Sequence, residues 1–158
     1  MTDIAFVPIT PGGLSLPGYD LTMSGPDLLA ENGLNTSVII SLFTDRQAEP
    51  GDVLPDGSSN RRGHWGDTFA AVNGDKLGSR LWLLSREKQT NATLNRAREY
   101  AEEALQWLID DGVAATVTVK ASWVRPGMLG MTIDIIRPDG SSENFRFEQA
   151  WNGALNAV

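Results

Sequence analysis

Cysteine is absent from the 158-residue sequence. A disulfide framework and a thiolate metal site are therefore excluded, so stability must come from packing. Histidine is almost absent, because His64 is the single one. A metal site or a nucleophilic triad would have to be built around that residue, and its sequence spacing supports neither. We predict no metal site and no catalytic residues.

Basic residues are scarce, with thirteen Lys plus Arg against twenty Asp plus Glu and a formal net charge of -7. None precedes Arg46, so the N-terminal quarter is acidic. A nucleic acid duplex or a membrane surface is itself negatively charged and would repel a protein with this net charge. No apolar run approaches the roughly 18 residues that span a bilayer. We therefore expect no nucleic acid partner, no signal peptide and no membrane segment.

Motifs for binding nucleotides are missing as well. The glycines do not form a G-x-G-x-x-G or Gly-Lys-Ser/Thr loop between a strand and a helix, so we predict no cofactor. The carboxylate pairs Glu102–Glu103 and Asp110–Asp111 are adjacent on a predicted helix and therefore do not face each other. A solvated helix surface accounts for these carboxylates.

Hydrophobic periodicity predicts an α+β fold. Apolar residues recur at helical spacing from about residue 90 or 93 to Asp111, where Gly112 ends the pattern, and this predicts one long amphipathic helix. Strict alternation over 117–119, 129–136 and 144–147, with a Pro-Asp-Gly turn at 138–140, predicts an antiparallel meander of three or four strands. We expect the apolar stripe of the helix to pack on this sheet.

The remaining segments are less regular. Proline and glycine interrupt residues 1–33, which we interpret as an extended N-terminal arm, mobile over its first 25 residues in the isolated chain. Residues 34–158 are expected to form one domain with a long loop at 48–78 and a short helix at 79–86. The apolar run at 36–43 fits either a helix or a strand, and Thr36 as an N-cap favours a helix.

The most distinctive run in the long loop is Arg-Arg-Gly-His-Trp-Gly-Asp at residues 61–67. Arginine and tryptophan are enriched at protein interfaces, where they supply planar donors and apolar area. An alternative of similar weight is that the loop folds over its own core and its arginines pair with internal carboxylates. The composition of the loop does not separate these two interpretations.

Five stretches carry a resemblance to a known family, in the same order along the chain: SLFTDR at 41–46, LP at 54–55, RRGHWGD at 61–67, GSRLWLL at 78–84 and YAEEALQWL at 100–108. Together they resemble the baseplate proteins of Mu-like contractile-tailed phages over roughly residues 27–151. That family is similar in turn to the wedge and sheath-initiator proteins of contractile tails.

The resemblance implies a structural virion subunit that is made in the host cytoplasm and is present in about six copies around a sixfold baseplate. Its implied partners are other wedge proteins, the tail sheath and the central hub or tube proteins. We predict that the residues binding these partners include Arg46, Arg61, Arg62, Trp65, Asp67 and Arg80. The alternative functions are a peptidoglycan-cleaving, lysozyme-like baseplate enzyme and a small-molecule or carbohydrate-binding module that uses tryptophan side chains.

Overall fold

The computed structural model describes residues 34–70, 72 and 74–151 in full, together with the backbone of six short strands between residues 3 and 31. The chain divides into two compact units, Met1–Ile40 and Ser41–Val158. The sequence-based division into an arm at 1–33 and a domain at 34–158 stays a prediction. Each unit is described by itself.

In the N-terminal unit the short strands pair antiparallel, two by two. The pairs are β1 (Asp3–Ile4) with β6 (Ala30–Glu31), β2 (Phe6–Ile9) with β3 (Gly18–Leu21), and β4 (Met23–Ser24) with β5 (Asp27–Leu28). Sequence patterns did not predict this pairing, because proline and glycine mask any period of two. The expected mobility of residues 1–25 falls largely outside the described residues.

Helix α1 (Asn35–Phe43) confirms the helical interpretation of the apolar run. Val38 and Leu42, four residues apart, are both buried, whereas Ile40 lies partly exposed on another side of the helix. The prediction that Thr36 is the N-cap was wrong. The helix begins at Asn35, one residue before Thr36, so Thr36 lies inside its first turn and is only 2% exposed.

The long predicted helix is confirmed as α2 (Asn91–Leu105), which continues into α3 (Trp107–Asp110) after a bend at Gln106. The Thr90 hydroxyl caps it by accepting a hydrogen bond of 3.1 Å from the Thr93 amide. Its buried face carries small residues as well as leucine, namely Ala97, Ala101, Ala104 and Leu105. Small side chains let the helix approach the sheet closely, and α2 packs against β7.

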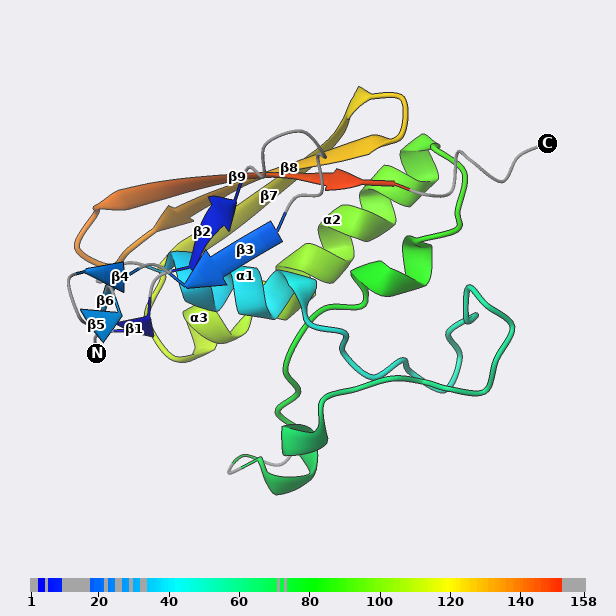
Figure 1. Cartoon of the computed structure of the whole chain (residues 1–158), viewed down its shortest axis with the longest axis horizontal. Helices are drawn as coiled ribbons and strands as arrows, with labels where there is room; N and C mark the ends of the chain where they lie inside the picture. The colour runs from blue at the N-terminus through cyan, green and yellow to red at the C-terminus, as the bar shows by residue number, and fades with distance from the viewer. Residues whose placement is uncertain are drawn as a thin grey trace. The chain divides into compact units, whose positions relative to one another are not determined.

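The predicted meander is also confirmed, as β7 (Thr116–Arg125), β8 (Met128–Ile136) and β9 (Ser142–Ala150) in the order β7-β8-β9 (Figure 1). Four alternating residues of the central strand are buried: Leu129, Met131, Ile133 and Ile135. The turn into β9 closes with a hydrogen bond of 2.9 Å from the Gly140 amide to the Arg137 carbonyl. The fold class is α+β, as predicted.

The long loop at 48–78 is present, and the short 3-10 helix η1 (Trp65–Phe69) lies within it. The predicted helix after it is the short η2 (Leu81–Leu84), whose first amide donates to the Ser79 hydroxyl at 3.3 Å. Backbone hydrogen bonds of 2.9 Å from Ser79 N to Thr44 O and 3.0 Å from Arg46 N to Ser79 O join the chain before and after the loop. Among the described residues, no helix is both long and apolar enough to span a bilayer.

Candidate partner-binding site

Arg80, a predicted partner-binding residue, lies inside the C-terminal unit. Its Nε donates to Glu103 Oε2 on α2 at 3.0 Å, and its Nη1 donates to both Asp52 oxygens at 3.2 and 3.1 Å. The guanidinium also lies 4.6 Å from the centre of the Tyr100 ring. Burial alone would lower the pKa of Arg80, but the hydrogen bonds to Glu103 and Asp52 outweigh burial and raise that pKa above its ordinary value. Arg80 therefore ties the long loop to α2.

Arg46 contributes to the same cluster from the chain just before the loop. Its Nη1 lies 3.7 Å from Glu103 Oε1, so the Glu103 carboxylate pairs with two guanidinium groups. The Trp82 indole donates to the Arg46 carbonyl at 2.9 Å. Arg46 Nε is buried without a hydrogen-bond partner among the described residues. The Arg46 side chain is 17% exposed, and its ion pair to Glu103 joins the chain before the loop to α2.

Arg61 and Arg62 hold the base of the loop. Arg61 Nε donates to the Ala48 carbonyl at 3.1 Å, and the Ala48 amide donates back to the Arg61 carbonyl at 2.9 Å. Arg62 pairs with Asp45 at 2.7 Å and covers the Trp82 ring at 4.3 Å from its centre, while its side chain stays partly exposed. Both residues have internal partners, but only Arg62 pairs with a carboxylate as the alternative interpretation of this run expected, because Arg61 bonds a backbone carbonyl.

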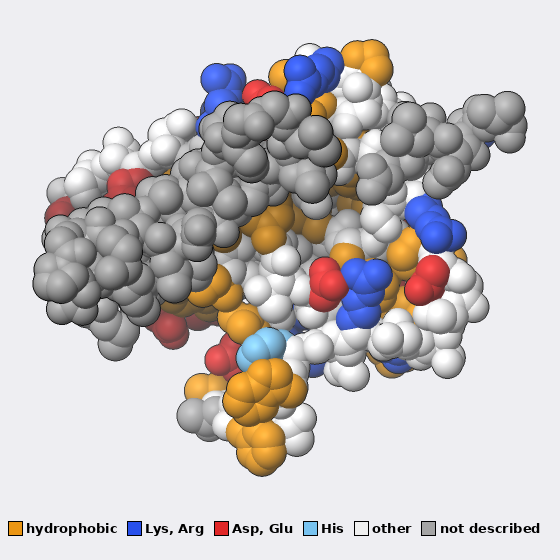
Figure 2. All heavy atoms as spheres, viewed as in Figure 1, with side chains coloured by type: hydrophobic (Ala, Val, Ile, Leu, Met, Phe, Trp, Pro, Cys, Tyr) orange, Lys and Arg blue, Asp and Glu red, His pale blue; other side chains and the backbone are white. Residues whose placement is uncertain are grey.

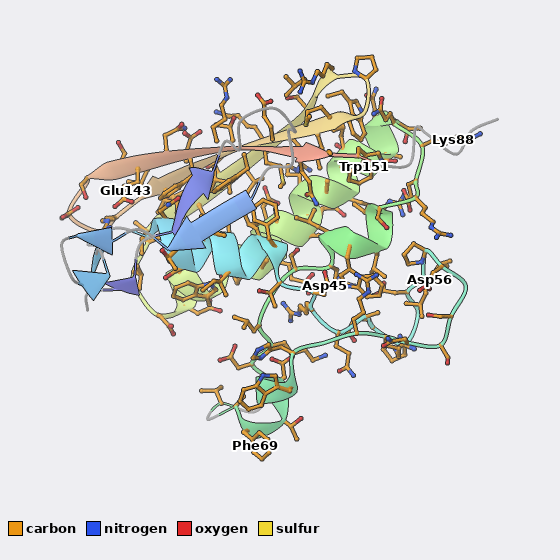
Figure 3. The ribbon with its side chains drawn as sticks, viewed as in Figure 1. Asp45, Asp56, Phe69, Lys88, Glu143 and Trp151 are labelled. Atoms are coloured by element: carbon orange, nitrogen blue, oxygen red, sulfur yellow. The ribbon has the colours of Figure 1, made fainter. Side chains whose placement is uncertain are left out.

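Trp65 differs from the arginines, because 78% of it is exposed. Phe69 follows four residues later on η1 and is 79% exposed, and Val72 is 67% exposed. Figure 2 shows apolar side chains gathered at the end of this projection, beside the histidine, and Figure 3 shows Phe69 at its extremity. We call Trp65, Phe69 and Val72 the apolar tip. Sequence reasoning missed Phe69 and Val72, although their place in a glycine-rich segment was a usable signal.

Short local contacts brace the segment that carries the tip. The His64 ring accepts a hydrogen bond of 3.2 Å from the Gly66 amide at the start of η1. Asp67 Oδ1, from another predicted partner-binding residue, accepts one of 3.1 Å from the Leu77 amide and so joins the two sides of the projection. Lys76 pairs with Glu49 at 3.2 Å. His64 and Asp67 therefore shape the loop that presents Trp65.

An open groove of about 450 Å³ lies beside the tip. Val72, Ala104 and Trp107 supply its apolar lining, and its charged lining residues are Arg46, Asp75, Lys76, Glu103, Asp110 and Asp111. Arg46 and Lys76 already pair with Glu103 and Glu49. Within the described residues, Asp75, Asp110 and Asp111 form no ion pair. The unpaired charge of the groove is negative.

The carboxylates considered for enzymatic chemistry have separate surroundings. Glu103 pairs with Arg46 and Arg80, whereas Glu102 lies 3.9 Å from Arg98 on the exposed side of α2. In the described part of the chain, no group of three or more His, Asp or Glu residues could hold a metal ion. The two glutamates do not form a site together, and a non-enzymatic role stays our prediction.

A small α+β domain with a sheet edge and a braced, projecting apolar tip is typical of proteins that bind other proteins. The chain belongs to the family described as Phage protein GP46, whose model matches residues 34–142. It is 46% identical over 153 residues to the baseplate protein gp46 of Escherichia phage Mu, covering 97% of this chain and 99% of that relative. It is also 41% identical over 133 residues to the Mu-like prophage FluMu protein gp46 of Haemophilus influenzae, covering 84% of this chain and 90% of that relative. The resemblance to Mu-like baseplate proteins is confirmed.

Proposed function

We propose that this chain is a non-enzymatic structural subunit of a phage tail baseplate and that it acts in the virion by binding neighbouring subunits. The observation that carries the proposal is the 46% identity to the Mu baseplate protein over nearly the full length of both chains. The fold supports it, since the loop presents an aromatic tip and several loop charges are used internally to brace that loop.

A more specific role within the baseplate is to join wedge proteins and to anchor the first ring of tail sheath, with about six copies in a sixfold assembly. The feature that supports sheath anchoring is β9, which is at one edge of the three-stranded sheet. A strand at an edge leaves backbone donors and acceptors that another chain can pair with. Contacts to hub or tube proteins belong to the same proposal.

The alternation of hydrogen bonds along β9 identifies the residues whose backbone N–H and C=O groups point away from β8. Trp151 N donates to Gly127 O at 2.7 Å and Arg137 N donates to Ser141 O at 2.8 Å, so odd-numbered residues of this strand bond to β8. In an antiparallel ladder the next residue points its N–H and C=O to the opposite side. Arg146, paired in register with Thr132, is one of these outward residues.

Arg146→Pro is expected to give baseplates that lack sheath. Proline removes the outward N–H while sparing the hydrogen bonds to β8, so a partner strand loses a donor but the fold keeps its ladder. Electron microscopy of tails from a phage deletion complemented with the variant measures the sheathed fraction. Arg146→Ala, which keeps the backbone N–H, is the matched control and should give sheathed tails. Sheathed tails from a folded Arg146→Pro variant would contradict strand pairing with sheath.

The baseplate assignment has its own test. Tails purified from wild-type phage should contain this chain, as measured by mass spectrometry, and a phage with the gene deleted should assemble no complete baseplates. If the chain is absent from tails, or if baseplates form without it, the proposed function is wrong.

A further inference from the structure

The apolar tip is an exposed aromatic surface on a braced loop. Trp65 and Phe69 leave more than three quarters of their surface in solvent, and they are four residues apart. Aromatic side chains of this size contribute strongly to binding when a partner buries them. Because the Asp67–Leu77 hydrogen bond and the Lys76–Glu49 ion pair already hold the loop, less conformational entropy is lost on binding.

The groove beside the tip, which we call the acidic groove, favours a partner of positive charge. Asp75, Asp110 and Asp111 line the groove without an ion-pair partner among the described residues. A partner that contacts the tip and the groove together would place its own charges opposite these carboxylates. Lysine or arginine there would be attracted, whereas a second copy of this acidic chain would be disfavoured by its formal net charge of -7.

We propose that the apolar tip and the acidic groove form one docking surface, and that its occupant is a different baseplate protein with an apolar pocket bordered by lysine or arginine. This inference rests on the proposed function and names the chemistry of one neighbour. Trp65 and Phe69 enter the pocket, and the basic border lies against Asp75 and Asp111. The arginines at 61 and 80 support the surface from within instead of contacting the partner, whereas Arg46 lines the groove beside its ion-pair partner Glu103.

The first test removes the aromatic surface. The double substitution Trp65→Ser and Phe69→Ser is expected to lower incorporation into tails by about thirtyfold or more, the effect of losing an interface anchor. The thermal midpoint should stay unchanged, because both side chains are exposed. Val53→Ser is the matched control, since Val53 is 86% exposed elsewhere on the same long loop. This control should incorporate normally.

The second test removes the charge of the groove. Asp75→Asn with Asp111→Asn should lower incorporation by between about two- and tenfold, as expected for two exposed ion pairs. Glu99→Gln with Glu102→Gln removes the same charge from exposed positions on α2 that do not line the groove, and should have no effect. If the groove variant and its charge control are incorporated equally well, the proposal that lysine or arginine borders the partner's pocket is wrong.

A photo-crosslinking amino acid in place of Phe69 identifies the neighbour in assembled tails. A crosslink to another baseplate protein, at a peptide with nearby lysine or arginine, supports the inference, and a crosslink to a second copy of this chain overturns it. If the wild-type chain is present in tails and the aromatic double variant is incorporated normally, the proposed docking surface is wrong, but the proposed function is unaffected. Absence of the wild-type chain from tails would instead refute the proposed function.

Discussion

Gly78→Ala is expected to lower the free energy of unfolding by about 3 kcal/mol or more, from backbone strain and overpacking combined. Gly78 has a φ of +97°, which side-chain-bearing residues rarely adopt. A Cβ there would lie 2.8 Å from the Thr44 carbonyl carbon and closer still to its oxygen. That oxygen accepts the Ser79 amide hydrogen bond, so the new methyl group would force apart the segments that this bond joins.

Gly57→Ala separates the two contributions to this loss. Gly57 also has a positive φ of +67°, but nothing lies within 4 Å of a Cβ placed on it. Its alanine variant should therefore lose only about 1 kcal/mol, the strain of the left-handed backbone. Urea unfolding of both variants measures the difference. Equal losses would show that the close approach to Thr44 is relieved by small movements and contributes little.

Arg80→Met is expected to destabilise the protein by about 2 to 3 kcal/mol, because the site is partly buried. It leaves the Asp52 carboxylate without a guanidinium partner and leaves Glu103 with only the ion pair of 3.7 Å to Arg46. The side chains of Arg80, Asp52 and Glu103 are only 19%, 15% and 32% exposed, so water replaces the lost partner incompletely. Thermal or urea unfolding measures the loss. Tail incorporation should fall as well, since Arg80 joins the loop that carries the apolar tip to α2.

Arg98→Met is the matched control on the same helix. Arg98 and Glu102 form an ion pair of 3.9 Å in which both side chains are nearly half exposed. Its loss should therefore change stability by about 0.5 kcal/mol or less. Adding Asp52→Asn to Arg80→Met should recover part of the stability, because the carboxylate that Arg80→Met leaves unpaired is then removed. A similar stability for the Arg80 and Arg98 variants would contradict the bracing role of Arg80.

Together these variants separate bracing from docking. Changes at Gly78 or Arg80 act first on stability and then on assembly, whereas changes at Trp65 and Phe69 act on assembly alone. Measuring unfolding and tail incorporation on the same set of variants therefore distinguishes residues that hold the loop from residues that contact a neighbour.

Sequence patterns alone determined the helix at 91–110, the three-stranded meander and the long loop. These features depend on information within a few residues: apolar spacing along α2, alternation along β8, and the Pro-Asp-Gly turn before β9. The run at 36–43 was ambiguous by the same logic, because its β-branched residues also fit a strand. Family membership was accessible too, since it depends on ordered motifs along the chain.

Tertiary structure decided which members of the predicted partner-binding set face inward. Arg80 is 28 residues from Asp52 and 23 from Glu103, so no local pattern could show that these side chains meet. The composition of the 61–67 run was equally consistent with docking and with bracing. Exposure of Trp65 and Phe69 likewise depends on how far the loop projects. Ion pairs and exposure arise from contacts between distant segments, which only the folded chain brings together.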